Sequence, residues 1–575
     1  MSIIKRATPV TLEGRGDVTL RPSDYVTQGG EGAIYRKDKH IIKLYLDPSK
    51  LMGGGLTDKI RILAKSFKHP SIVAPQGLVF DKSGVAIGFY MPFVEGEALP
   101  PLFTNDRDQR GFTNDSAITL AAKMHEVVGQ VHGGKALMID GNELNWLADI
   151  TKIKDPVPYI IDVDSWQIDR FKASVIMPSI RDWQTSGFTQ ATDWFAWGIV
   201  TFNLFTGIHP YKGGLDGYKP GELERRMKEN ASVFHPNIRL NKAVRDFSLI
   251  PGPLLDWYHA TFAQGIRTQP PSPAQTGKTN TQFGKTLRIV TTTTGGLTYR
   301  KLFSLSDEKI ISVWPCGVVR TDKGSLYEVS SKKKIAETTG ARVAVTTQEN
   351  GWLITEGDKD FSWRFIERNG ATTNLKLPIL PTTVFRSGER LFAITETEMV
   401  EAVLHQFAKP LLTFGSRWQI LGQATHWYNA VGISNVLGAL HLVVPFGTEA
   451  VAMVRTPEID NIRVLGAIAG HRFVEVIVLN KNGDYEALSF AFDKNYQTYT
   501  VERRTVDSPE QNLTALPKGV VAEIRTDGLL TITVPQNQVT KEVSEKDLST
   551  DMRLTRIGDQ VVYLKDGDLW SLSMI

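Results

Sequence analysis

The pattern of apolar and polar positions changes at about residue 287. Beyond it, short apolar or alternating segments recur between turns rich in Gly, Asn and Asp, which is typical of antiparallel strands. Marker residues in these segments are spaced 29 to 48 positions apart, mostly near 40–45: Tyr327, Trp363, Phe392, Leu440, Tyr485, Leu530 and Trp570. Four-stranded units of that length, repeated over about 285 residues, predict an all-β domain that is a six- or seven-bladed β-propeller. A pair of packed β-sheets is the alternative architecture.

The first half of the chain mixes strand-like and helix-like patterns. Lys43 lies within the apolar strand IIKLY, where a charge requires a partner. Upstream, Gly29, Gly30 and Gly32 belong to a predicted hairpin. Because glycine lacks a Cβ, backbone N–H groups in such a hairpin can approach phosphate oxygens, which would also supply the partner of Lys43. An ordinary hairpin with a lysine that reaches solvent is the other interpretation.

Three polar residues follow apolar runs in a pattern that suits phosphate chemistry. Asp140 and Asn145 stand five residues apart on a predicted loop, and Asp162 ends the apolar run that begins at Tyr159. Oxygen atoms of Asp and Asn side chains suit Mg²⁺, which neutralises phosphate charge. A further carboxylate can accept the proton of an attacking hydroxyl. Because Asp and Asn are also common loop residues, the pattern indicates a phosphoryl-transfer site only when it is taken together with the segments that flank it.

Together with their neighbours, these segments resemble the ordered motifs of protein kinases. The hairpin and Lys43 match G-x-G-x-x-G-x-V and V-A-I-K, with Thr27 in place of the first Gly. Kinase-like segments that flank the site are HPSIV at 69–73, FYMPFVEG at 89–96, TDWFAWGIV at 192–200 with TGIHPY at 206–211, and FAQGIRTQPPS at 262–272. The closest resemblance is to a divergent bacterial and phage family of Ser/Thr protein-kinase-like proteins that carry GGEG-x-VY, G-D-x-N-x-x-N and D-x-D-S-F-Q.

The resemblance implies a multidomain chain in which an α+β bilobal kinase-like fold precedes the all-β domain. The kinase-like domain would span 1–267, with a small lobe over about 20–95 and a large lobe over about 96–267. Residues 268–286 are rich in Pro, Thr and Gln and are predicted to form a linker. The β-propeller would then span 287–575.

The resemblance also implies ATP and Mg²⁺ as cofactors and assigns roles to individual residues. Asp140 and Lys43 would be catalytic, and Asn145 and Asp162 would bind the metal, with Asp164 as the second choice for Asp162. Asp193 would brace the catalytic loop from beneath. The residues expected to contact ATP are Gly29, Gly30, Gly32, Ile34, Lys43, Met91, Pro92 and Val94, with Met91 as gatekeeper.

Two departures from the family pattern bear on activity. Met138 and Ile139 stand where His and Arg usually precede the catalytic Asp. Lys59 stands where a helix usually carries the Glu that pairs with the strand Lys. Either Asp58 replaces that Glu, or Lys43 is held otherwise, or the domain is catalytically weak. A Ser/Thr-type protein kinase is the leading hypothesis, and the alternatives are a nucleotide-binding pseudokinase scaffold and a small-molecule kinase.

Composition limits the remaining function classes. The chain has 575 residues, 41% of them hydrophobic, and a net charge of only +4. This charge is far from the strong basic balance of an electrostatic nucleic-acid binder, so no nucleic acid is expected. The single cysteine, Cys316, excludes an internal disulfide and fits a reducing compartment. With no signal peptide or long apolar run, a cytoplasmic protein without a membrane span is expected, whose propeller recruits an unknown protein partner or substrate.

Overall fold

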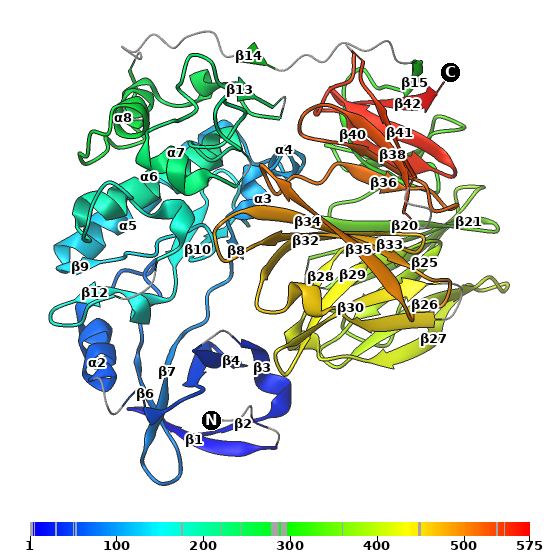
Figure 1. Cartoon of the computed structure of the whole chain (residues 1–575). Helices are drawn as coiled ribbons and strands as arrows, with labels where there is room; N and C mark the ends of the chain where they lie inside the picture. Colours follow the sequence, from blue (N-terminus) through cyan, green and yellow to red (C-terminus); the bar gives the residue numbers. More distant parts are fainter. Residues whose placement is uncertain are drawn as a thin grey trace.

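The computed structural model describes most of the chain as two regions that lie side by side (Figure 1). The described residues are 4, 6–28, 31–49, 51, 55–173, 176–219, 221–241, 243–277, 287–288, 296–358, 360–446, 450–535, 539–545 and 547–574. The first region combines helices and strands, and the second consists of strands. Residues 278–286, the last nine of the predicted linker, lie outside the described residues.

The N-terminal region begins with a seven-stranded antiparallel sheet in the order β2-β1-β6-β7-β5-β4-β3. Its strands are β1 (Thr8–Leu12), β2 (Gly16–Leu20), β3 (Tyr25–Gln28), β4 (Gly32–Lys37), β5 (His40–Tyr45), β6 (Gly77–Phe80) and β7 (Ala86–Pro92). Helix α2 (Leu56–Ser66) covers one face and buries Ile60 and Leu63. An acidic residue in its first turn and a basic residue in its last turn, Asp58 and Lys65, complement the helix dipole.

Alternation along β5 gives this sheet two different faces. Ile42 and Leu44 point into a core shared with the β1–β2 hairpin. Lys43 and Tyr45 point to the opposite face, where Tyr45 packs with Phe89. The predicted apolar strand with an inward lysine is therefore present, and its lysine faces the helical part of the region.

The rest of the N-terminal region is mostly helical, with several short strands between the helices. Its helices are α3 (Pro100–Phe103), α4 (Asp106–Gln109), α5 (Asn114–Gly133), α6 (Gln190–Thr206), α7 (Leu223–Lys228) and α8 (Gly252–Ala263). The short strands are β8 (Glu97–Ala98), β9 (Ala136–Leu137), β10 (Trp146–Asp149), β11 (Val157–Ile160), β12 (Gln167–Ile168) and β13 (Arg239–Leu240), and β13 pairs with β14 (Leu287–Arg288).

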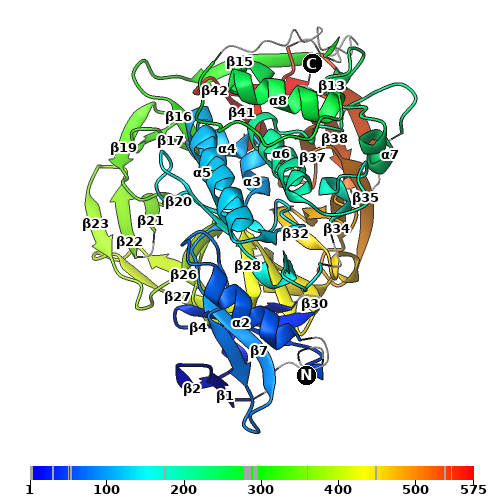
Figure 2. The ribbon, with the colours of Figure 1, turned by 90° about the vertical axis from the view of Figure 1, so that its left-hand side faces the viewer.

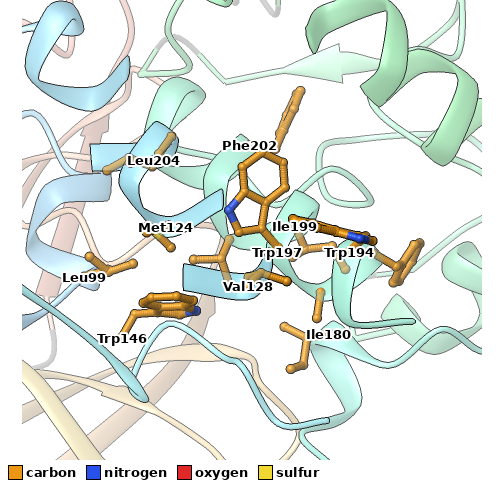
Figure 3. Close-up of a cluster of buried hydrophobic side chains, with 14 of the residues drawn as sticks. Leu99, Met124, Val128, Trp146, Ile180, Trp194, Trp197, Ile199, Phe202 and Leu204 are labelled. Atoms are coloured by element: carbon orange, nitrogen blue, oxygen red, sulfur yellow. The ribbon is translucent and has the colours of Figure 1, made fainter. Parts of the chain in front are cut away.

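Helix α6 is the centre of this part, and every residue from Thr192 to Thr206 is buried. Trp194, Trp197 and Phe202 project from it into a cluster that α5 completes (Figure 3). Gly207 ends the helix in the left-handed region, with φ of 76°, a conformation that glycine adopts without a steric penalty. A helix buried on all sides is a stable platform for the loops that rest on it.

The described C-terminal strands form seven separate four-stranded antiparallel sheets. Six are consecutive: β16 (Ile310–Trp314), β17 (Val318–Thr321), β18 (Ser325–Glu328), β19 (Lys333–Glu337); β20 (Arg342–Gln348), β21 (Gly351–Gly357), β22 (Phe361–Glu367), β23 (Thr372–Leu375); β24 (Thr383–Ser387), β25 (Arg390–Ile394), β26 (Glu398–His405), β27 (Leu411–Gln419); β28 (Thr425–Tyr428), β29 (Val431–Val436), β30 (Ala439–Phe446), β31 (Ala450–Arg455); β32 (Arg463–Gly470), β33 (Phe473–Leu479), β34 (Tyr485–Phe492), β35 (Tyr499–Val506); β36 (Leu513–Ala515), β37 (Val521–Ile524), β38 (Leu530–Val534), β39 (Val539–Val543). The seventh joins β40 (Arg553–Ile557), β41 (Gln560–Lys565) and β42 (Asp568–Met574) to β15 (Leu297–Phe303).

This arrangement is consistent with a propeller-like domain, and it does not fit two large packed sheets. In the seventh sheet the earliest strand, β15, pairs with the last, β42, so the two ends of the region are joined by hydrogen bonds. Figure 2 looks onto the N-terminal region, with the four-stranded sheets following one another around it. No helix among the described residues is long and apolar enough to cross a membrane.

Candidate functional site

The polar residues singled out in the sequence meet where the seven-stranded sheet faces the helical part. Lys43 Nζ lies 2.7 Å from Asp164 Oδ2 and 3.2 Å from Asp162 Oδ1. Asp162 and Asp164 follow β11, and Lys43 comes from β5. Although burial by itself lowers the pKa of Lys43, the two carboxylates outweigh it and hold that pKa above its ordinary value. The lysine is therefore a fixed cation at the junction.

The two aspartates differ in what surrounds them. The side chain of Asp164 is 5% exposed and also accepts a hydrogen bond of 2.8 Å from the Tyr45 hydroxyl. The side chain of Asp162 is 40% exposed. A carboxylate that already accepts two internal donors is an anchor for Lys43, whereas an accessible one can still bind a cation. The geometry thus favours the structural role for Asp164 and keeps Asp162 as the metal-binding candidate.

Lys59 of α2 completes this cluster instead of disrupting it. Its Nζ donates a hydrogen bond of 2.6 Å to the backbone carbonyl of Asp164. Burial lowers the pKa of Lys59, and the nearby Asp164 carboxylate partly offsets this. Two lysines therefore face two aspartates. The suggestion that Asp58 pairs with Lys43 is wrong, because Asp58 is exposed and forms an ion pair of 3.1 Å with Arg170.

The loop that carries Asp140 is held from below by α6. Asp193 accepts hydrogen bonds of 2.8 and 2.9 Å from the backbone N–H groups of Met138 and Ile139, and one of 3.0 Å from His132 Nε2. These contacts agree with the bracing role expected of Asp193. They also hold Ile139 at a φ of 62°, a left-handed conformation that a β-branched residue rarely adopts.

A second left-handed residue, Asp162 with φ of 59°, lies at the other side of the site. Such conformations cost about 1–3 kcal/mol each and persist where the surrounding structure enforces them, which is often at functional sites. Partial burial and the nearby Asp164 carboxylate raise the pKa of Asp162, and Lys43 opposes the shift. Two residues with strained backbone conformations, Ile139 and Asp162, therefore lie on either side of the candidate site.

Asp140 and Asn145 are joined directly. The Asn145 side-chain amide donates a hydrogen bond of 2.7 Å to the backbone carbonyl of Asp140. The Asp140 carboxylate accepts one of 2.8 Å from the Met177 N–H, which fixes the orientation of the carboxylate. Burial raises the pKa of Asp140, and the Met177 N–H opposes the shift. With its nitrogen engaged, Asn145 has its side-chain oxygen as the atom able to bind a cation.

The candidate metal ligands lie on neighbouring segments. The N–H of Ile161, next to Asp162, donates a hydrogen bond of 2.9 Å to the Asn145 carbonyl. Among the described residues, no three His, Cys, Asp or Glu side chains are grouped to hold a metal. Mg²⁺ bound with a nucleotide needs only one or two protein carboxylates, because phosphates and water fill its other positions. Asp162 and Asn145 fit that pattern.

The structure describes six of the eight residues expected to contact ATP. Gly29 and Gly30 lie outside the described residues. Ile34 pairs with Lys43 in register, and Met91 pairs with Ile41 on the same face and packs beside Phe89. Pro92 and Val94, both half-buried, end β7 and follow it.

Gly32 has a reason to be glycine that is separate from phosphate binding. A Cβ at this position would lie 2.8 Å from the Leu44 carbonyl oxygen. The close pairing of β4 with β5 therefore excludes a side chain there, whether or not a phosphate lies nearby.

Sequence reasoning missed the contacts of Lys43 with Asp162 and Asp164, and it also missed the contacts that Tyr45 and Lys59 make with Asp164. Tyr45 stands two residues from Lys43 on the same strand, so period-two alternation already placed both on one face. The contact of Lys59 had no comparable signal, because a helical lysine is usually exposed. Comparison with protein-family models gives no match for this chain, and comparison with curated protein sequences gives none either.

Close to the site, His209 supports the segment that contacts Asp140. Its Nε2 donates a hydrogen bond of 2.8 Å to the Ser179 carbonyl, and its Nδ1 accepts one of 3.1 Å from the Tyr211 N–H. The imidazole is 4% exposed, and burial, together with Lys212, lowers the pKa of His209 to about 3. The ring is therefore neutral in the folded chain.

This neutral histidine predicts a loss of stability in mild acid. Between the ordinary pKa of 6.5 and the folded value of about 3, the unfolded chain binds a proton that the folded chain does not. The free energy of unfolding should then fall by about 1.4 kcal/mol per pH unit below about pH 6. Denaturant unfolding at pH 7, 6 and 5 measures this slope. A His209→Gln variant with the same slope as wild type would exclude His209 as its source.

Proposed function

We propose that the N-terminal region is a protein-kinase-like phosphotransferase that uses ATP and Mg²⁺, and that the seven-sheet region is a β-propeller that binds a partner or substrate. The observation that carries this proposal is the meeting of Lys43, Asp162 and the Asp140–Asn145 loop at one junction. These residues come from three separate segments, and strained or buried backbone holds each in place. Such an arrangement supplies both a phosphate-binding cation and an oriented base.

The proposed reaction assigns one task to each group. Lys43 contacts the α- and β-phosphates of ATP, and Asp162 with Asn145 holds Mg²⁺. The bound Mg²⁺ neutralises phosphate charge. Asp140 orients the acceptor hydroxyl and takes its proton as the acceptor oxygen bonds to the γ-phosphorus and the bond to the ADP oxygen breaks. Most of the rate gain in such a site comes from positioning and electrostatic stabilisation.

A nucleotide-binding pseudokinase scaffold is the second candidate. It is favoured by Lys59, which occupies the helix position where the family has its Glu. Its contact with the Asp164 carbonyl gives Lys43 a surrounding unlike that of ordinary kinases. The third candidate, a small-molecule kinase, follows from the family features missing before Asp140.

Incubation of the full chain with Mg²⁺ and γ-labelled ATP separates the three candidates. Label on the protein itself or on an added protein supports a protein kinase. Label on a metabolite alone supports a small-molecule kinase. A melting temperature raised by ATP with no transfer to any acceptor supports the scaffold. A parallel reaction with excess chelator should abolish transfer if Mg²⁺ is required.

A further inference from the structure

The turn at residues 480–485, between β33 and the start of β34, contacts the loop that carries Asp140. Tyr485, the first residue of β34, donates a hydrogen bond of 3.2 Å from its hydroxyl to Glu143 Oε1. Glu143 lies between Asp140 and Asn145 in the chain. Both partners are buried, Tyr485 to 3% and Glu143 to 5% exposure. The contact is therefore part of a protein interior and not a loose surface encounter.

The same turn also packs closely against the segment 177–179, which orients the Asp140 carboxylate. Gly483 has a φ of 82°, and a Cβ at this position would lie 2.1 Å from Ser179 Oγ. Ser179 stands two residues after Met177, whose N–H binds the Asp140 carboxylate. Close backbone approach at Gly483 thus supports a second segment of the site.

Charged groups reinforce this contact. Asp484 Oδ1 lies 3.8 Å from Lys212 Nζ, and that Nζ lies 4.8 Å from the centre of the Tyr485 ring. Lys212 is itself largely buried. A cation placed over an aromatic face and near a carboxylate is stabilised in such an interior.

The turn is internally rigid. Asn480 Oδ1 accepts hydrogen bonds of 2.9 and 3.0 Å from the N–H groups of Asn482 and Asp484, and its backbone carbonyl accepts one of 3.0 Å from Gly483. Because these hydrogen bonds already order the turn, it can hold Glu143 in place with little further loss of conformational entropy.

Other contacts fix the seven-sheet region to both parts of the N-terminal region. Glu510 accepts a hydrogen bond of 2.7 Å from the Asn105 N–H, and Arg553 lies 2.9 Å from Asp106. On the seven-stranded sheet, the Tyr25 hydroxyl donates a hydrogen bond of 3.3 Å to Asn435. The seven-sheet region is therefore anchored to the N-terminal region at several points besides this turn, and these contacts fix the position of the turn.

We infer that the seven-sheet region contributes to the phosphotransfer site, with Tyr485 as a positioning residue that holds the Asp140–Asn145 loop through Glu143. This inference rests on the proposed function. Without the Tyr485 hydroxyl, the buried Glu143 carboxylate loses a donor, and the loop must shift to find another. A shift of Glu143 displaces Asp140 and Asn145, which flank it.

The test uses Tyr485→Phe in the full chain, because phenylalanine keeps the ring that packs beside Lys212. The turnover number for phosphate transfer should fall about tenfold, the size expected for one hydrogen bond to a charged group. The KM for ATP should change less than the turnover number, because Lys43 and Asp162, which contact the nucleotide and its metal in the proposed site, lie on other segments. Tyr499→Phe is the matched control, because Tyr499 lies on β35 of the same sheet and its hydroxyl donates a hydrogen bond to Glu458 and not to the Asp140–Asn145 loop.

A second pair of variants separates positioning from packing. Glu143→Ala should lose as much turnover as Tyr485→Phe, and the double variant should lose no more than either alone. Glu143→Gln keeps an oxygen acceptor and should retain more turnover than Glu143→Ala. Additive losses, or unchanged turnover in Tyr485→Phe, would overturn the inference.

Amide hydrogen exchange provides a readout that does not depend on transfer. Peptides covering 138–146 should exchange faster in Tyr485→Phe than in wild type or Tyr499→Phe. Equal exchange in all three proteins would overturn the inference even if wild type transfers phosphate. Faster exchange together with no transfer by wild type would support the positioning contact and contradict the proposed function.

Discussion

Replacing Asp140 with asparagine is expected to reduce phosphate transfer by about 10²–10⁴-fold, the contribution typical of a positioned general base. The amide keeps an oxygen that can accept the Met177 N–H, so the loop should stay in place. It cannot take the acceptor proton, and this is the only step that should fail. Steady-state transfer from labelled ATP measures the loss.

Binding and folding provide the controls for this variant. Because Asp140 is not assigned to the nucleotide, the Kd for Mg·ATP and the melting temperature should stay close to those of wild type. If Asp140→Asn turns over within about threefold of wild type, the proton goes elsewhere and the role assigned to Asp140 is wrong.

Replacing Lys59 with glutamate is expected to lower the free energy of unfolding by about 3–5 kcal/mol, as when one partner of a buried ion cluster is removed. This change introduces the residue that protein kinases usually have at the corresponding helix position. Here, however, Asp164 already pairs with Lys43, and Lys59 bonds to the Asp164 carbonyl. A glutamate would face two carboxylates and a carbonyl oxygen with a single lysine nearby. Denaturant unfolding measures the loss.

Two companion variants test the electrostatic explanation. Lys59→Met keeps the apolar stem and removes one hydrogen bond, so its cost should be smaller, about 1–3 kcal/mol. Adding Asp164→Asn to Lys59→Glu removes one of the competing carboxylates and should recover part of the lost stability. A Lys59→Glu protein as stable as wild type would show that Asp164 is not the anchor of Lys43.

The sequence predicted the parts of the site whose signals are local. Lys43 stands in an apolar strand, and Asp140 and Asn145 share one loop. The spacing of the later strands predicted six or seven four-stranded units, and the described strands form seven such sheets. Each of these signals depends on residues near one another in the chain.

The rest depended on packing between distant segments. Whether Asp162 or Asp164 faces solvent follows from the left-handed turn at Asp162 and from the burial of Asp164 under Tyr45. The sequence offered Asp162 as the metal ligand and Asp164 as the second choice, and it could not predict which of the two is buried. Nor did it indicate the contact of Tyr485 with Glu143, because the two residues are 342 positions apart.

The account is tested most directly by a crystal structure of the full chain with Mg²⁺ and a non-hydrolysable ATP analogue. We expect a metal at about 2.0–2.1 Å from oxygen atoms of Asp162 and Asn145. Lys43 Nζ should lie within hydrogen-bond distance of the α- or β-phosphate, with the γ-phosphate directed toward Asp140. A nucleotide bound elsewhere, or no nucleotide at saturating concentration, would contradict the proposed phosphotransfer site.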